Sequence, residues 1–377
     1  MVSRATGKVA DVADCSTADG ADVRQWTWLT TPASSSGSCR PPEAPPVDPC
    51  PPQLTAPPRE LRLHAEAQGA LGWAPGGGHP AHHSSLSVIG AGGRPAAADR
   101  AVVCRKCHDV GMDVRKRNRV SVTGRKGGPV VVLAHGFGCD QNLWRLVVPE
   151  LGKHFRVVLF DHVGAGGSDV SAWSPERYST LDGYVQDVIE LCQELGLGPV
   201  TFVGHSVSSM IGVLAVVQEP GLFDKLVLLT PSPSYIDDGD YRGGFSEQDI
   251  DELLDSLDSN YLGWSATVAP VIMGNPDRPE LGEELTNSFC RMDPEIARVF
   301  ARVTFLSDNR ADLSKVSVPT LVAESARDTL APREVGAFVH RQIPGSELVT
   351  LDSTGHCPQL SAPRETAEAI IAFVQGS

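Results

Sequence analysis

Residues 200–208 read Val-Thr-Phe-Val-Gly-His-Ser-Val-Ser, an apolar run that ends in a turn of small residues around Ser206. A second apolar run, from Met210 to Val217, follows at once. A strand, a sharp turn that carries a serine and a helix form the geometry of a nucleophile elbow, which exposes one hydroxyl above a sheet. Ser208 stands where glycine is more usual, but its side chain is still small. The stretch predicts that Ser206 is a catalytic nucleophile.

Two later residues supply the partners that such a serine needs. A hydroxyl is a weak nucleophile, so it requires a base and a carboxylate that orients the base. His356 lies in a loop after the last expected strand, and Asp328 follows the apolar run at 320–324. Three other acids fit the carboxylate role less well, because two belong to a helical region and one lies in the histidine's own loop: Asp308, Asp312 and Asp352. We predict a serine hydrolase in which Ser206, Asp328 and His356 form the triad.

Apolar runs and amphipathic segments alternate through the second part of the chain. Continuous apolar runs such as 130–134 are typical of strands buried on both faces of a parallel sheet. Strands are predicted at 119–122, 130–134, 156–160, 200–203, 225–230, 319–324 and 346–351. Helices are predicted around 142–151, 181–195, from 208, 332–342 and 363–374.

Residues 234–311 interrupt this alternation. They contain amphipathic helical segments and no buried strand pattern: 247–257, 259–269, 280–292 and 294–304. We therefore predict an α/β-hydrolase fold, a mostly parallel sheet flanked by helices, with a helical cap inserted after the sixth strand. The cap is expected to roof a cavity above the carboxyl ends of the strands, where such sheets bind ligands.

Acyl transfer also needs donors for the oxyanion that develops on the substrate. The backbone N–H of Val207, directly after the nucleophile, is one candidate. The other is the N–H of Phe137 in His-Gly-Phe-Gly, which follows the run at 130–134. Both donors belong to the main chain, so side-chain substitutions do not remove them.

The first part of the chain has a different composition. All 11 Phe and all 5 Tyr lie after residue 111, and residues 1–111 hold 13 Pro and 12 Gly. Few large apolar side chains leave little to offset the entropy of ordering the backbone. We predict that residues 1–111 are either a disordered extension or an over-extended gene model, and that residues 112–377 form the hydrolase domain with its cap at about 234–311.

Composition also excludes several functions. The net charge of −14 falls entirely on residues 112–377, which argues against nucleic acid as a partner. No run of 18 apolar residues and no apolar signal-peptide core near the start are present, so we expect no membrane span and no export signal. The scattered cysteines of the domain, Cys139, Cys192, Cys290 and Cys357, are typical of a reduced cytoplasmic protein. The Cys-x-x-Cys-His at 104–108 matches a haem-attachment pattern, but its context favours coincidence. We expect no metal and no cofactor.

Several longer strings resemble RsbQ-type α/β-hydrolases, the bacterial relatives of the plant karrikin and strigolactone receptors. The resemblance runs from about residue 113 to 375. It is carried by His-Gly-Phe-Gly-Cys-Asp-Gln-Asn-Leu-Trp at 135–144, Val-Gly-His-Ser-Val-Ser at 203–208, Pro-Ser-Pro-Ser-Tyr-Ile-Asp-Asp at 231–238, Tyr-Arg-Gly-Gly-Phe at 241–245, Asn-Tyr-Leu-Gly-Trp at 260–264 and Gly-His-Cys-Pro-Gln-Leu-Ser at 355–361.

The resemblance implies a pocket and a signalling role. The pocket would be apolar, covered by a four-helix cap and lined by substrate-binding aromatic residues: Phe137, Tyr235, Phe245, Trp264 and Phe305. Proteins of the RsbQ type act with a PAS-domain-bearing PP2C phosphatase to switch on a general stress response, which is a form of sigma factor regulation. The substrate would be a small apolar ester or lactone. A stand-alone metabolic esterase or lactonase and a slow-turnover ligand receptor remain the alternatives.

Overall fold

The computed structural model describes residues 10–12, 23–25 and 113–376. In the N-terminal unit, which spans residues 1–48, β1 (Ala10–Val12) pairs antiparallel with β2 (Val23–Gln25). The rest of the predicted extension lies outside the described residues, and so does the Cys-x-x-Cys-His at 104–108. The interpretation of residues 1–111 therefore stays a prediction.

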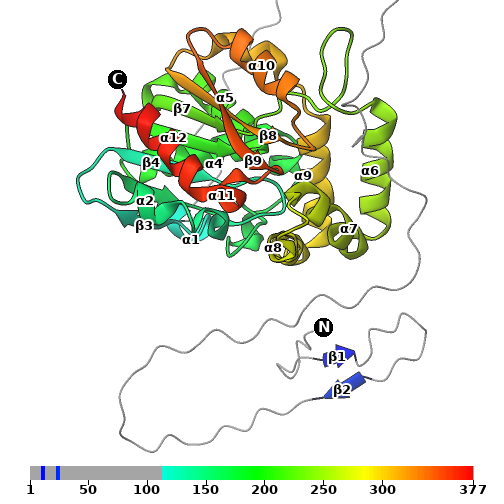
Figure 1. Cartoon of the computed structure of the whole chain (residues 1–377). Coiled ribbons are helices and arrows are strands. Elements are labelled where there is room, and N and C mark those ends of the chain that lie inside the picture. The colour runs from blue at the N-terminus through cyan, green and yellow to red at the C-terminus, as the bar shows by residue number, and fades with distance from the viewer. Residues whose placement is uncertain (1–9, 13–22, 26–112, 377) are drawn as a thin grey trace, which may run out of the picture. The chain divides into compact units, whose positions relative to one another are not determined.

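Residues 113–376 fold around a seven-stranded sheet of order β3-β5-β4-β6-β7-β8-β9 (Figure 1). Its strands are β3 (Ser121–Gly124), β4 (Val130–Ala134), β5 (Arg156–Leu159), β6 (Val200–His205), β7 (Phe223–Leu229), β8 (Thr320–Arg327) and β9 (Glu347–Thr354). Only the edge strand β3 is antiparallel to its neighbour, β5. The mostly parallel α/β sheet that the apolar runs predict is confirmed.

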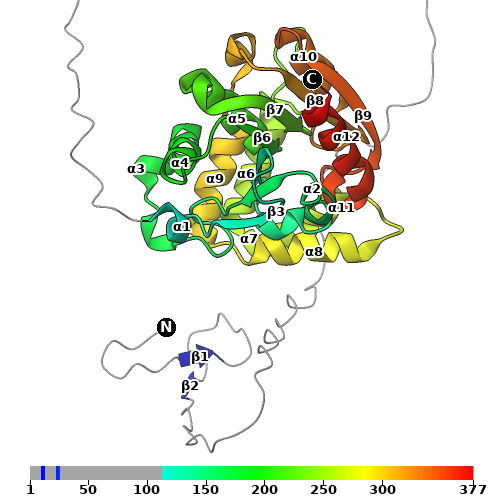
Figure 2. The same cartoon turned by 90° about the vertical axis from the view of Figure 1, so that its left-hand side faces the viewer.

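The sheet separates two apolar cores, because successive side chains of a strand point to opposite faces. In β4, Val131 and Leu133 join one core, and Val132 and Ala134 join the other. Figure 2 shows α2 (Val148–Leu151), α11 (Pro358–Ser361) and α12 (Pro363–Gln375) on one side of the sheet, and α4 (Leu181–Glu194) and α5 (Val207–Gln218) on the other. Further helices are α1 (Val114–Arg117), α3 (Pro175–Tyr178) and α10 (Arg333–Gln342).

The cap consists of α6 (Glu247–Ser259), α7 (Tyr261–Met273), α8 (Pro279–Cys290) and α9 (Pro294–Leu306). It follows β7, the fifth strand of the sheet in chain order, so its expected place after the sixth strand is wrong. The five strands predicted before residue 234 all form, as β3 to β7, so the expected place was one strand too late. A capping box between Ser246 and Asp249 starts α6, and Gly274 ends α7 at a φ of 62°.

Two predicted boundaries near the start of the domain are shifted. The edge strand begins at Ser121 rather than residue 119, because Asn118 caps α1 and Arg119 has a φ of 44°. The helix predicted at 142–151 is split into a 3₁₀ turn, Gln141–Trp144, and α2, which has Pro149 in its first turn. Proline favours a helix start over a helix interior because it has no N–H to donate.

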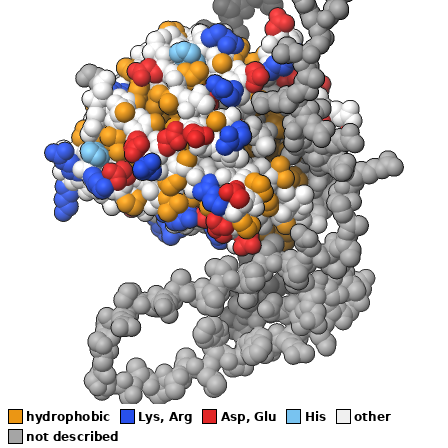
Figure 3. Space-filling view, in the orientation of Figure 1, with side chains coloured by type: hydrophobic (Ala, Val, Ile, Leu, Met, Phe, Trp, Pro, Cys, Tyr) orange, Lys and Arg blue, Asp and Glu red, His pale blue; other side chains and the backbone are white. Residues whose placement is uncertain are grey.

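The surface of this domain carries charges of both signs. On the face shown in Figure 3, basic and acidic side chains are interspersed among apolar ones. One exposed ion pair, Arg145 with Glu284, links the segment before α2 to the cap helix α8. Among the helices that the structure describes, none combines the length and apolar character that crossing a bilayer requires.

Candidate active site

Ser206 occupies a sharp turn between β6 and α5. Its φ of 56° and ψ of −124° are rare for a residue with a side chain, and its N–H donates to Leu229 O at 2.9 Å. The turn is possible because Gly204 has no side chain: a Cβ there would lie 2.2 Å from Ser208 O. The geometry is that of a nucleophile elbow, as the sequence predicts.

Ser206, His356 and Asp328 form one chain of hydrogen bonds. Ser206 Oγ lies 2.8 Å from His356 Nε2, and His356 Nδ1 lies 2.8 Å from Asp328 Oδ2. The other carboxylate oxygen of Asp328 accepts from the N–H groups of Leu330 and Ala331, at 2.8 and 3.2 Å. Because the carboxylate accepts from Nδ1–H, it leaves Nε2 as the acceptor for the serine proton.

The His356 loop is held from both the sheet and the cap. His356 O accepts hydrogen bonds from His205 Nε2 at 2.8 Å and from Thr230 Oγ1 at 3.1 Å. His356 N–H donates to Ile272 O, near the end of α7, at 2.9 Å. Burial lowers the pKa of His205 to about 3, so His205 is a neutral donor. These bonds fix the loop without adding a charge beside the imidazole of His356.

The loop after β4 packs directly against the nucleophile. A Cβ on Gly136 would lie 2.8 Å from His205 Nδ1 and 3.1 Å from Ser206 Cβ, so a larger residue there would have to push this loop away from the elbow. Phe137 follows in the same loop, and Val207 is the first residue of α5, where a helix has N–H groups without intrahelical partners. The two main-chain donors that the sequence nominates therefore belong to segments on either side of Ser206.

Ser208, the departure from the usual glycine, joins the elbow to this loop. Its Oγ donates to His135 O at 2.5 Å, and His162 Nε2 lies 2.7 Å from the same Oγ. Burial lowers the pKa of His162 well below its ordinary value, so His162 is neutral and donates from Nε2. Where a glycine is more usual, Ser208 therefore supplies a hydroxyl that connects α5 to the loop after β4.

A family pattern matches this arrangement. The pattern of the alpha/beta hydrolase family covers residues 131–369, from β4 into α12. The chain belongs to the alpha/beta hydrolase family.

The hydrolase is similar to plant proteins and to a bacterial one. Strigolactone esterase D14 of Arabidopsis thaliana is 40% identical over 243 residues, which are 64% of this chain and 91% of that protein. Karrikin insensitive 2 receptor CA of Petunia hybrida is 41% identical over 251 residues, 66% of this chain and 93% of the receptor. The structure of a hydrolase from Oleispira antarctica has a TM-score of 0.69 at 43% identity, covering 70% of this chain and 97% of that one.

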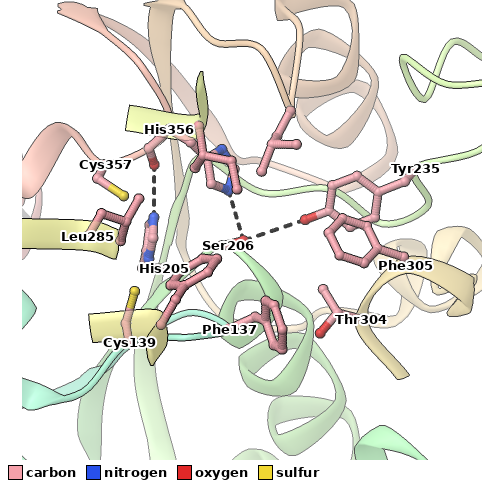
Figure 4. Close-up of a pocket in the computed structure, with 13 residues that line it drawn as sticks. Phe137, Cys139, His205, Ser206, Tyr235, Leu285, Thr304, Phe305, His356 and Cys357 are labelled. Atoms are coloured by element: carbon pink, nitrogen blue, oxygen red, sulfur yellow. Dashed lines mark hydrogen bonds between the residues drawn. The ribbon is translucent and has the colours of Figure 1, made fainter. Parts of the chain in front are cut away.

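This alpha/beta hydrolase has a small cavity beside Ser206, between the sheet and the cap (Figure 4). The space that the centre of a water molecule can occupy in it is about 20 Å³, enough for about one water. Its wall is mostly apolar, and burial raises the pKa of the Cys139 and Cys357 thiols, so they add no charge. The Tyr235 hydroxyl oxygen lies 3.4 Å from Ser206 Oγ.

The structure places the five nominated aromatic residues in two groups. Phe137, Tyr235 and Phe305 line the cavity. Phe245 and Trp264 are buried but are not among the residues that line this cavity, and their part in substrate binding stays a prediction. The Phe289 ring stacks on Trp264 at 5.9 Å between centroids and meets Phe137 edge-on at 5.6 Å. Trp264 also meets Phe137 edge-on, at 6.3 Å between centroids. The backbone of Phe245 instead bonds to that of Tyr235, its N–H donating at 3.1 Å.

Sequence reasoning missed most of the cap wall. The additional lining residues from α7, α8 and α9 are Ile272, Leu285, Phe289 and Thr304. Leu285 and Phe289 are four residues apart, which places them on one face of a helix, but this spacing does not tell which cap face meets the cavity. Among residues 113–376 and the two short strands, no group of three His, Cys, Asp or Glu side chains is arranged to hold a metal ion.

Proposed function

We propose that this hydrolase cleaves small apolar carboxylic esters or lactones with Ser206 as nucleophile, His356 as base and Asp328 as the carboxylate that orients it. The observation that carries the proposal is the hydrogen-bonded chain of these three side chains, of which Ser206 and His356 line a mostly apolar cavity. The names of the relatives, which include an esterase, support an ester as the substrate.

The reaction follows from the positions of the protons. Ser206 Oγ attacks the acyl carbon while its proton passes to His356 Nε2. The bond from the acyl carbon to the alcohol oxygen then breaks, and His356 returns the proton to that oxygen. A water molecule attacks the acyl-serine, gives one proton to His356 and releases the acid. That proton finally returns to Ser206, so the enzyme is regenerated.

The main chain would stabilise the oxyanion in both tetrahedral intermediates. The N–H groups of Val207 and Phe137 are the donors in this proposal. Support comes from Gly136, whose close approach to Ser206 brings the Phe137 loop against the nucleophile. The bridge from Ser208 Oγ to His135 O keeps the elbow and the loop in register.

Hydrolysis of 4-nitrophenyl acetate and butyrate by the full chain tests this function. We expect turnover, with a burst of nitrophenol if deacylation is slow, and a loss in Ser206→Ala on the order of 10³-fold or more in kcat. Ser171→Ala, which changes an exposed serine that does not line the cavity, is the control and should keep the wild-type rate. Equal background rates in wild type and Ser206→Ala would leave a ligand receptor as the better account.

We further propose, on the motif resemblance, that the reaction serves a signalling role of the RsbQ type with a PAS-containing PP2C phosphatase. Calorimetric titration of the full chain into such a phosphatase, with and without ester substrate, tests the partnership. Binding that requires an intact Ser206 supports a hydrolase that signals. Multiple turnover without any binding identifies a stand-alone metabolic esterase or lactonase, and binding with a single turnover identifies a slow receptor.

A further inference from the structure

Thr304 is an unusual residue in the cavity wall. It belongs to α9, directly before Phe305, and lines the cavity that contains Ser206 (Figure 4). The residue is only 3% exposed, and its Oγ1 has no hydrogen-bond partner among the residues that the structure describes. Buried hydroxyls nearly always have a partner, so an unpartnered one in a cavity wall is a candidate for bonding to a ligand.

Other hydroxyls in the cap helices donate to the backbone of their own helix, whereas the Thr304 hydroxyl does not. A serine or threonine inside a helix commonly donates to the carbonyl four residues earlier. Thr286 in α8 does this, with Oγ1 2.9 Å from Gly282 O, and Ser265 in α7 does the same to Tyr261 O at 2.8 Å. Thr304 makes no such bond to its own helix, so its O–H is not committed to the backbone of α9.

Among the lining residues that belong to the cap helices α7, α8 and α9, Thr304 alone carries a hydroxyl. The other cap-side and loop residues are mostly apolar: Phe137, Ile272, Leu285, Phe289, Phe305 and Leu330. The Tyr235 hydroxyl lies 3.4 Å from Ser206 Oγ. His205 Nδ1 also lacks a partner among the described residues, but the backbone of Gly136 covers it, since a Cβ on Gly136 would lie only 2.8 Å away.

We propose that Thr304 is a specificity-determining residue: its hydroxyl donates a hydrogen bond to an oxygen of the substrate that is not part of the ester bond being cleaved. The preferred substrate is then a compact ester or lactone that carries a further ether, carbonyl or hydroxyl oxygen. This inference rests on the proposed hydrolase function and adds the chemical class of the substrate.

The size of the cavity supports a short substrate. A cavity that holds about one water in the empty protein must expand to admit an ester, and its cap wall consists of side chains on separate helices. A ligand that contacts Ser206 in so small a space also reaches the opposite wall. An apolar ligand there would bury the Thr304 hydroxyl without a partner, whereas one with a further oxygen would satisfy it.

A pair of isosteric esters tests this recognition. In 4-nitrophenyl methoxyacetate an ether oxygen replaces one methylene of 4-nitrophenyl butyrate, so the acyl groups have nearly the same length. We expect Thr304→Val to lower the ratio of kcat/KM for methoxyacetate to kcat/KM for butyrate about tenfold. The different intrinsic reactivity of the two esters cancels, because each protein is measured with both.

Two variants control the measurement. Thr304→Ser keeps a hydroxyl and should keep a ratio near wild type. Thr286→Val removes a buried threonine hydroxyl that is bonded to its own helix, so the ratio should not change. If Thr304→Val lowers both kcat/KM values equally, the hydroxyl has a purely structural role or holds a water, and the proposal is overturned.

A binding experiment separates this proposal from the hydrolase function itself. Dissociation constants of ethyl methoxyacetate and ethyl butyrate are measured by NMR titration on Ser206→Ala and on Ser206→Ala/Thr304→Val. We expect Ser206→Ala to prefer methoxyacetate about tenfold and the double variant to lose the preference. This result without wild-type turnover would reject the hydrolase and keep the recognition role. Wild-type turnover would keep the hydrolase function, but an unchanged kcat/KM ratio in Thr304→Val and no binding preference would reject the recognition role of Thr304.

Discussion

The sheet side and the cap side of the cavity are built by different means. On the sheet side, Ser206, His356 and Asp328 each have hydrogen-bond partners, and the loops that carry them are tied to neighbouring backbone. On the cap side the wall is mostly apolar, and Thr304 Oγ1 has no partner among the described residues. Hydrogen bonds therefore fix the groups that would react. On the cap side, the packing of apolar side chains shapes the space for the substrate.

The two sides are joined at the histidine loop. His356 N–H donates to Ile272 O, and Asn275 Nδ2 donates both to Met273 O and to Thr354 O, each at 2.8 Å. The end of the cap helix α7 therefore helps to hold the base. We therefore expect substitutions on the sheet side or at this junction to cause large losses of activity. Substitutions in the cap wall should instead change which substrates are preferred.

The largest expected effect comes from the sheet side. Asp328→Asn keeps the size of the side chain but removes the charge that orients His356, and we expect kcat to fall about 10⁴-fold. Steady-state hydrolysis of 4-nitrophenyl butyrate measures it. Asp352→Asn is the matched control: this acid lies four residues before His356 but is exposed, so its rate should stay near wild type. A large loss of kcat in Asp352→Asn, with little loss in Asp328→Asn, would contradict the assignment of Asp328 to the triad.

The junction gives the next largest effect. Gly355 has a φ of 84°, and a Cβ there would lie 1.8 Å from Met273 O, so Gly355→Ala must move the histidine loop or α7. We expect kcat to fall about 100-fold or more, because a displacement near 1 Å is enough for such a loss.

Gly345→Ala separates this contact from backbone strain. Gly345 has a similar φ of 68°, but a Cβ there would meet nothing within 4 Å. Both variants are compared by kcat and by thermal unfolding. Equal losses of kcat in the two would show that contact between the cap and the loop has no role.

A change in the cap wall should alter preference more than rate. Leu285→Ala enlarges the cavity, and we expect hydrolysis of 4-nitrophenyl hexanoate relative to acetate to rise about tenfold. The measurement is kcat/KM over a series of acyl lengths. Leu281→Ala removes a buried leucine one turn earlier in α8 that does not line the cavity, so its profile should match wild type. An unchanged profile in Leu285→Ala would contradict the cap's role in selection.

The smallest expected effect is on the pH dependence of stability. The pKa of His205 is about 3 in the folded protein and near 6.5 when unfolded, so between these values the unfolded state binds more protons. The stability that neutral His205 contributes is present above about pH 6.5 and is lost as the pH falls toward 3.

Urea unfolding between pH 7 and 5 measures this loss. We expect His205→Gln to reduce the slope of the unfolding free energy by about 1 kcal/mol per pH unit below pH 6. His340→Gln, on the surface helix α10, should leave the slope nearer to wild type. Identical slopes in wild type and His205→Gln would show that His205 is not held neutral.

Much of the sheet side was predictable because its signals are local. The run Val-Val-Val-Leu-Ala at 130–134 is apolar at every position, as a central parallel strand requires, and it forms β4. The elbow needs small residues at fixed offsets from Ser206, and these are visible in the sequence. The cap wall was harder to predict because amphipathic helices bury several faces against one another. Trp264 was nominated and Thr304 was not, since which of them meets the cavity depends on how α7, α8 and α9 pack.

By itself the sequence determined the strand and helix order, the elbow and the three residues that come together at it. Strands, turns and a serine between small residues are set by chemistry within a few positions of the chain. Only the tertiary structure decided that α7 holds the His356 loop, that Phe289 stacks on Trp264 and that the Thr304 hydroxyl lacks a partner among the described residues. These features depend on contacts between helices distant in sequence, and no local pattern specifies the rotation at which such helices pack.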